Sequence, residues 1–535
     1  MKTKDVKENK EVKGKFQTRL QKKVFENELF MKILLSMPKI DYKLEKFGYP
    51  IEQLNQAKKA AQESKNEAEL DRIYTVLRQE FSVNFKEQVS ILIRKVIELS
   101  KIENQELGFK AGKYYQYNGK YWEALDKNIL GEFLVEVGIK SSMKDYSARQ
   151  PQNKVYLLDS LASQGVIIPE NQNLIKINLL NGVFNIDPKD LTKGSLKEHN
   201  PNDGFTYVLE FEYQPKATCP LFQKFLDRIL PDKDTQSVIL EYMAYCLTDN
   251  LHYEKALFAF SQGLSGKSTL QQIFFQLIGN HCISSYSLAK LCDSSGYYRA
   301  ELIDKRVNCC GELGSGKIDY DMFKQIVSGE NIEARSPFGK PFNFEVSCKL
   351  WFNVNTLPYI ESILALKRRL LLVPFNVTIP KEEINTNLAN EICETELPGI
   401  FNLLLQGLVR LVKQGGFTES IEINEAVDNY MKENDTVRLF LDDGLYEKSS
   451  TDKVLREDLY KFYREYCSTN GYACCSSGKF GNRLRNLNYT VWRSTGGLYY
   501  VDCARKLTKI EKYNKELEES NVSEIEKALK RKVLN

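Results

Sequence analysis

The 535-residue sequence has only three histidines, and its twelve cysteines include no C-x-x-C pair. Zinc domains need such residues at short spacings, so none is expected. The doublets Cys309-Cys310 and Cys474-Cys475 are poorly placed for ordinary disulfides, which favours a reducing compartment. No stretch reaches the roughly 18 uninterrupted apolar residues that a membrane helix needs, and no apolar run follows the charged N-terminus. These absences predict a cytoplasmic protein with no membrane partner.

The chain also lacks a large excess of charge of one sign, because its net charge at pH 7 is only +4. A nucleic-acid partner therefore cannot be inferred from the total and would need local basic surfaces. Residues 1–23 are one such segment, with nine Lys or Arg, three Asp or Glu and a net charge of +6. This composition is typical of a solvated tail, and DNA contact is the alternative interpretation.

The patterning along the chain predicts several domains. Apolar residues recur three and four positions apart between 52 and 104, which indicates a basic, helical N-terminal region over 1–104. Two Asn-Gly pairs, at 118–119 and 181–182, lie between apolar runs and predict hairpins in a small α+β domain over 105–210. The remainder divides into a motor with a preceding helical segment (211–425), a winged-helix-like domain (426–504) and a charged helical tail (505–535).

The segment FSQGLSGKSTL, residues 260–270, contains a phosphate-binding loop without its usual first glycine. The pattern G-x-x-x-x-G-K-[ST] has Ser261 at that position. An apolar run precedes the loop and helical spacing follows it, as a loop that surrounds phosphates with backbone N–H groups requires. The lysine would neutralise phosphate charge, and Ser268 would hold magnesium. We therefore predict a site for ATP and Mg²⁺ formed by Gly263, Leu264, Ser265, Gly266, Lys267, Ser268 and Thr269.

Four further polar residues follow or precede apolar runs downstream. Glu312 ends the run at 307–310 and is the candidate magnesium ligand and catalytic carboxylate. The usual second acid is missing because Gly311 precedes it; Glu312 serves alone, or Asp304 or Glu301 assists. Asn355 ends the run at 348–354 and is placed to contact the γ-phosphate or orient water. Before the next run lie two candidates for an arginine finger in a neighbouring subunit, Arg368 and Arg369.

The sequence resembles superfamily 3 helicases of the phage and plasmid replication type, which include the poxvirus replicative ATPase. The resemblance rests on the order of four motifs: the loop, the strand-end Glu, the strand-end Asn and the two arginines before a strand. The resemblance covers about residues 110–500 and is nearest to replication initiators of staphylococcal-type genomic islands. It implies an α/β P-loop ATPase with an AAA+-like sheet, a helical and α+β N-terminal region, and a C-terminal winged-helix domain. It also implies a ring, expected to be a hexamer, in which each subunit projects a hairpin into a central pore.

Basic and aromatic residues mark two candidate DNA-binding surfaces. The hairpin of the family corresponds to residues 323–346, where the turn SPFGKPF carries an aromatic and a cation suited to single-stranded DNA. Two expected helices and a strand pair around Gly496-Gly497 resemble a winged helix, which often binds duplex DNA. The predicted DNA-binding residues are Arg335, Phe338 and Lys340 in the hairpin, and Lys479, Arg483, Arg485 and Arg493 in the C-terminal domain.

The leading hypothesis is an ATP-dependent DNA helicase that starts or drives replication of a mobile element. A primase fusion is rejected because residues 1–198 contain no histidine for such a catalytic site, although a separate primase is a possible partner. The alternative is an initiator or loader whose ATP site drives assembly only. The missing first glycine and the single acid at 311–312 favour that alternative.

Overall fold

The computed structural model describes most of the chain between residues 19 and 505. The described residues are 19–47, 56, 59, 63, 83–168, 175–187, 190–249, 253–261, 263–311, 313, 318–337, 339–355, 366–433, 435–443, 446–495 and 498–505. They belong to two compact units. The first comprises 1–254, 264–353 and 377–418, and the second comprises 255–263, 354–376 and 419–535. The charged tail expected over 506–535 lies outside the described residues.

The N-terminal part of the first unit combines helices with a four-stranded sheet. The sheet has the order β3-β2-β1-β4, and helices and strands share one apolar core. Asn118 closes the β2–β3 hairpin, because its Oδ1 accepts hydrogen bonds from the backbone N–H groups of Lys120 and Tyr121. The elements are α2 (Arg19–Glu26), α3 (Glu28–Ser36), α4 (Tyr42–Phe47), α7 (Phe85–Ile102), β1 (Leu107–Lys110), β2 (Lys113–Tyr117), β3 (Trp122–Leu125), α8 (Lys127–Lys140), α9 (Asp145–Ala148), α10 (Pro151–Gln164) and β4 (Val166–Ile167).

A separate antiparallel sheet follows, formed by β5 (Ile175–Leu179), β6 (Gly182–Asp187) and β7 (Asp190–Lys197). The second Asn-Gly pair lies in its first turn, as predicted. Gly182 has φ of +143°, and a Cβ there would lie 2.4 Å from the carbonyl oxygen of Lys197. Glycine is therefore needed because any side chain would collide with the neighbouring strand.

The centre of the chain forms a five-stranded sheet of order β14-β8-β13-β10-β9. The pairings β14–β8, β13–β10 and β10–β9 are parallel. The near-continuous apolar runs that predicted these strands are typical of parallel strands buried on both faces. The sheet and its helices therefore form an α/β core of the P-loop type. The strands are β8 (Ala256–Phe260), β9 (Ile283–Ser284), β10 (Val307–Cys310), β13 (Lys349–Val354) and β14 (Leu370–Pro374).

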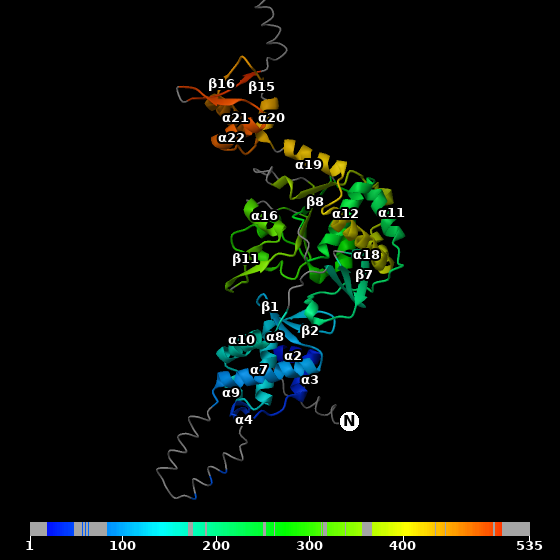
Figure 1. Ribbon diagram of the computed structural model, residues 1–535, viewed down its shortest axis with the longest axis vertical. Helices are drawn as coiled ribbons and strands as arrows, with labels where there is room; N and C mark the ends of the chain where they lie inside the picture. Colours follow the sequence, from blue (N-terminus) through cyan, green and yellow to red (C-terminus); the bar gives the residue numbers. More distant parts are fainter. Residues whose placement is uncertain are drawn as a thin grey trace, which may run out of the picture. The chain divides into compact units, whose positions relative to one another are not determined.

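Four longer helices, α11 (Pro220–Ile229), α12 (Lys233–Cys246), α13 (Lys267–Ile278) and α18 (Leu388–Gln414), accompany this core. Helix α18 contacts each of the other three, and α11, α12 and α18 lie together in Figure 1. The elements outside the sheet between α13 and β13 are η2 (Asn280–Cys282), α14 (Leu288–Leu291), α15 (Tyr297–Ala300), α16 (Tyr320–Ser328), β11 (Asn331–Arg335) and β12 (Pro341–Glu345).

Helix α11 takes its N-terminal cap from another helix. Its own N-cap residue, Cys219, makes no side-chain cap bond. Instead the buried carboxylate of Glu396, on α18, accepts hydrogen bonds from the backbone N–H groups of Leu221 and Phe222 at 3.0 and 2.9 Å. A carboxylate at a helix N-terminus satisfies orphan donors and complements the helix dipole. The packing of α11 on α18 therefore depends on Glu396.

We expect Glu396→Ala to lower the free energy of unfolding of the first compact unit by about 1–2 kcal/mol, the usual loss for a removed N-cap. Chemical denaturation followed by circular dichroism would measure it. Glu394→Ala is the matched control because Glu394 is exposed on the same helix. Equal losses in both variants would contradict a capping role for Glu396.

The C-terminal part of the second unit contains α19 (Ile421–Glu433), α20 (Thr436–Asp443), α21 (Arg456–Asn470) and α22 (Ser477–Asn486). The predicted strand pair is present as β17 (Val491–Arg493) and β18 (Tyr499–Val501), and β16 (Val454–Leu455) joins it as a third strand. Short strands β15 (Tyr446–Lys448) and β19 (Cys503–Arg505) form a second pair. Figure 1 shows α20, α21 and α22 gathered beside these strands. Their apolar residues form a separate core.

All twelve cysteines are free, and ten of them are buried. Among the described residues, no helix is both long and apolar enough to span a membrane.

Candidate functional site

The predicted phosphate loop connects strand β8 to helix α13. Gly266 takes a left-handed conformation, with φ of +80°, immediately before the helix begins. A Cβ at Gly266 would lie 2.5 Å from Cγ2 of Ile229. This position therefore requires glycine both for its positive φ and for the lack of space for a side chain. Gly263 has φ of +118°, and no atom lies within 4 Å of where its Cβ would be. The positive φ alone therefore makes glycine favourable at position 263.

Ser261 fits at the position where the motif usually has glycine. Its φ is not in the left-handed region, unlike that of Leu264, at +48°. A serine there therefore carries no backbone strain. Its buried side-chain Oγ accepts a hydrogen bond from the backbone N–H of Gly263 at 3.2 Å. The residue thus holds the start of the loop.

Lys267 and Ser268 open helix α13. The Lys267 side chain is buried, and burial lowers the pKa of its ammonium group. A bound phosphate would favour the charged form again, so the position suits a polyanionic ligand. Ser268 is exposed and Thr269 is half-buried, whereas Ser265 is buried. A nucleoside triphosphate with magnesium would require these groups: a helix N-terminus, a lysine and an exposed hydroxyl.

Behind the loop, Gln271 of α13 links two strands of the sheet. Its Oε1 accepts a hydrogen bond from Nδ2 of Asn353 at 2.6 Å, and its Nε2 lies 2.7 Å from Sγ of Cys309. Asn353 is itself held by the indole N–H of Trp351 at 2.9 Å. This amide network fixes helix α13 against β10 and β13. Sequence analysis missed it because the partners are far apart in the chain and carry no motif.

The strand-end residues are only partly described. Glu312 follows β10 but lies outside the described residues. Asn355 follows β13 and is exposed. Asp304, a suggested helper acid, precedes β10 and so lies at the end of that strand opposite to its carboxyl end. Its Oδ2 accepts a hydrogen bond from the Tyr115 hydroxyl at 2.5 Å, so the structure argues against a role for Asp304 at the magnesium site.

The two arginines before β14 differ in exposure. Arg369 is buried, and its carbonyl oxygen accepts a hydrogen bond from the backbone N–H of Ala256 on β8. The side chain of Arg368 is exposed. Of the two side chains, that of Arg368 is therefore the more accessible to another molecule.

The predicted hairpin is present as antiparallel strands β11 and β12. On β11, Ile332 and Ala334 are buried whereas Arg335 is exposed, and Lys340 is exposed at the turn. The hairpin is tied down by Arg299 of α15, whose Nε donates to the carbonyl oxygen of Glu333 at 2.9 Å. Phe338 lies outside the described residues. The hairpin therefore presents two cations on a firmly anchored ribbon.

The basic residues predicted for the C-terminal domain have different environments. Arg483 forms an ion pair with Asp435 at 3.1 Å, in a partly buried position. Arg485 is exposed and donates to the side-chain oxygen of Asn482. Lys479 and Arg493 are exposed. The ion pair gives Arg483 a structural role inside its domain, which makes it the weakest candidate for DNA contact. These residues and the hairpin cations belong to different compact units.

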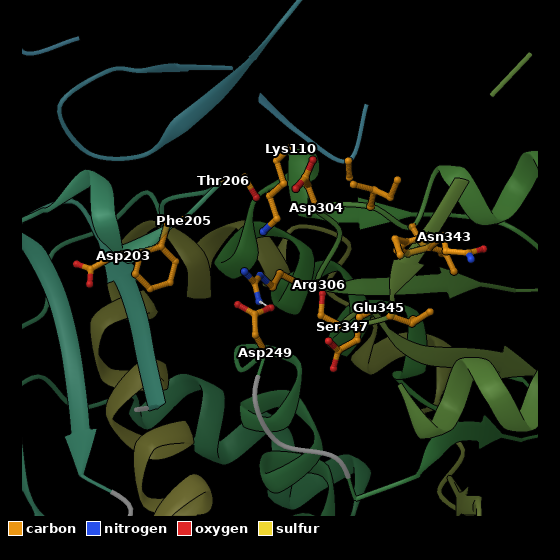
Figure 2. A pocket seen from close by; sticks show the side chains of 16 residues that line it. Lys110, Asp203, Phe205, Thr206, Asp249, Asp304, Arg306, Asn343, Glu345 and Ser347 are labelled. Atoms are coloured by element: carbon orange, nitrogen blue, oxygen red, sulfur yellow. Dashed lines mark hydrogen bonds and ion pairs between the residues drawn. The ribbon is translucent and has the colours of Figure 1, made fainter. Parts of the chain in front are cut away.

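The first unit also holds a cavity of about 480 Å³ that is separate from the phosphate loop. Figure 2 shows the ion pair of Arg306 and Asp249 in it, with Lys110 pointing toward the pair. Burial alone would raise the pKa of Asp249, but the charge and hydrogen bond of Arg306, together with the charges of Lys349 and Lys110, lower it. The guanidinium also lies 4.1 Å from the ring centroid of Tyr207. Arg306 is thus held in place by an ion pair with Asp249 and by its contact with the ring of Tyr207.

Three segments of the chain match family models: D5 N terminal like (residues 106–231), a family of unknown function, DUF5906 (259–369), and Poxvirus D5 protein-like (432–525). The chain is also similar to the Acanthamoeba polyphaga mimivirus protein named "Putative helicase L207/L206", with 26% identity over 337 residues. That match covers 58% of this chain and 34% of the relative, so the chain spans about a third of the relative's length.

Among solved structures, the A form apo structure of NrS-1 C terminal region-CTR is 13% identical, with a TM-score of 0.42, and covers 76% of this chain and 98% of that one. The apo structure of NrS-1 C terminal region is 13% identical, with a TM-score of 0.41 and coverage of 76% and 97%. The D5-type sequence matches support the resemblance to a D5-type superfamily 3 helicase. Closeness to staphylococcal-type initiators stays a prediction.

Proposed function

We propose that this chain is an ATP-dependent DNA helicase that acts in replication of a mobile genetic element. The observation that carries the proposal is the β8–loop–α13 segment, in which Gly263 and Gly266 have positive φ and the buried Lys267 begins the helix. A glycine-containing loop at a helix N-terminus with such a lysine suits phosphate binding. The matches to D5-type families at both sides of this segment, and the mimivirus relative named as a helicase, support the choice of reaction.

Different residues of the chain would bind the phosphates, hold the metal and orient water. ATP supplies the phosphoryl group, and Mg²⁺ neutralises charge on its oxygens. Backbone N–H groups of residues 263–268 and the Lys267 ammonium would bind the phosphates. Ser268 and Glu312 would hold the metal, and Asn355 would orient water toward the terminal phosphate. Arg368, which is exposed, would reach the nucleotide of a neighbouring subunit.

DNA would be gripped in two places. In a ring, for which we propose six subunits, the exposed Arg335 and Lys340 of each hairpin would contact the phosphates of a single strand without reading its bases. The C-terminal domain, proposed to be winged-helix-like, would bind duplex DNA at an origin through Lys479, Arg485 and Arg493. A primase on a separate chain is the expected partner for primer synthesis.

A second candidate function is an initiator or loader that binds DNA in response to ATP but does not unwind it. The single acid at the end of β10 favours this candidate. The fit of Ser261 weakens it, because the degenerate first position introduces no strained backbone into the loop.

Unwinding of forked DNA by the purified wild-type protein, with ATP and Mg²⁺, separates the two functions. We expect strand displacement with ATP and none with a non-hydrolysable ATP analogue. DNA binding that depends on ATP but is not followed by displacement would favour the initiator or loader.

A further inference from the structure

The three-stranded sheet β16-β18-β17 of the C-terminal domain has two chemically different faces. Val454, Val491 and Val501 point to the apolar core of the domain. Because side chains alternate along a strand, Trp492 and Tyr500 occupy the opposite face. These two residues pair directly in the register of β17 and β18, and both are half-exposed. Neither belongs to the apolar core cluster.

The two aromatic side chains form a fixed platform. Their rings stack, with centroids 5.2 Å apart and planes inclined by 26°. The indole N–H of Trp492 donates to Oδ1 of Asp502 at 2.7 Å, which holds the larger ring in one orientation. A large half-exposed aromatic pair that is oriented in this way offers a flat π-surface to a ligand.

One cation lies over the platform. Nζ of Lys453, an exposed side chain, lies 5.4 Å from the ring centroid of Trp492 and 5.6 Å from that of Tyr500. Arg493 and Tyr499, which pair in the next register position, lie on the other face of the sheet with Val491 and Val501. Residues 446–505 contain ten Lys or Arg and six Asp or Glu. The aromatic pair and the Lys453 ammonium over it, in a domain with an excess of basic residues, are complementary to a polyanion that has planar groups.

We propose that this outer face binds single-stranded DNA, with bases stacked on Trp492 and Tyr500 and a phosphate near Lys453. Stacking on an aromatic platform suits unpaired bases, because paired bases in a duplex do not expose their faces. The binding would tolerate any sequence, since every base has a π-face. The choice of DNA over RNA rests on the proposed function, whereas the stacking geometry does not.

The chain has three tryptophans, and the fluorescence of two of them should respond little to a bound ligand. Trp122 and Trp351 are 0% and 1% exposed, so quenching of accessible tryptophan emission reports on Trp492. We expect an oligothymidylate to quench this emission in the full-length protein without ATP. Trp492→Phe should abolish the quenching yet retain most of the affinity measured by fluorescence anisotropy, because the phenyl ring still stacks.

Removal of both rings, in Trp492→Ala/Tyr500→Ala, should weaken oligothymidylate binding about tenfold or more. Lys453→Ala should weaken it less and reduce its salt dependence. Tyr472→Ala is the matched control, because Tyr472 is exposed in the same domain but lies off the sheet. Circular dichroism would show that each variant is folded.

Unchanged affinity in the double variant, absence of quenching, or tighter binding of an oligouridylate than of the DNA would overturn the proposal. Unwinding and ATP hydrolysis are not part of this readout. A protein that proves to have no helicase activity can therefore still pass this test, and a working helicase can fail it.

Discussion

Lys267→Ala is expected to reduce ATP hydrolysis by about 100-fold or more and to abolish unwinding of forked DNA. The Lys267 ammonium is buried at the first position of α13, where it would lie against the transferred phosphate. A preorganised charge in a water-poor site contributes more to the transition state than it would in bulk water, so its loss is costly. A phosphate-release assay with saturating single-stranded DNA would measure the effect.

Lys290→Ala provides the control for this prediction. Lys290 is exposed on α14 and lies over the ring of Tyr298, away from the loop in sequence and outside the proposed nucleotide site. Its removal changes the net charge equally but should leave hydrolysis near the wild-type rate. Hydrolysis by Lys267→Ala at the rate of Lys290→Ala would contradict a nucleotide site in this loop.

Local patterns in the sequence were sufficient to predict the elements that carry the candidate site. The apolar run at 255–260 and the helical spacing at 268–278 correspond to β8 and α13, because both periodicities are set by backbone geometry within a few residues. The hairpin turns after Tyr117 and Leu179 were equally local, since Asn-Gly adopts the turn conformation without strain.

Interactions between distant residues could not be predicted in this way. Tyr115 and Asp304 are separated by 189 positions, and their hydrogen bond places Asp304 away from the role suggested for it. Arg483 looked suitable for DNA contact on its helix, but Asp435 pairs with it from another element. A side chain's own segment does not reveal which partner the fold brings to it.

The loop itself shows why a motif can lose a residue and keep its geometry. Glycine is necessary only where φ is positive or a Cβ would collide. Gly266 meets both conditions, whereas Ser261 meets neither. The first glycine of the pattern is thus replaceable, and the serine adds a hydrogen bond to the backbone N–H of Gly263.

Lys340→Ala is expected to lower the rate of unwinding at least tenfold, while ATP hydrolysis without DNA falls far less. Lys340 is exposed at the hairpin turn, and a proposed contact between one cation per subunit and the DNA backbone would be lost around the whole ring. Parallel assays of strand displacement and of ATP hydrolysis without DNA would separate the two effects. Lys324→Ala is the control, because Lys324 lies on the preceding helix α16 and pairs with Asp321.

The reason to expect such uncoupling is the way the hairpin is anchored. Arg299 holds β11 through the carbonyl oxygen of Glu333, and it also donates to the carbonyl oxygens of Leu291 and Asp293. These bonds connect the ribbon to its support through the backbone and do not involve Lys340. Truncation of Lys340 should therefore remove the grip on DNA and leave the ribbon in place. Equal losses of unwinding and of DNA-independent hydrolysis would mean that the turn supports the fold of the motor.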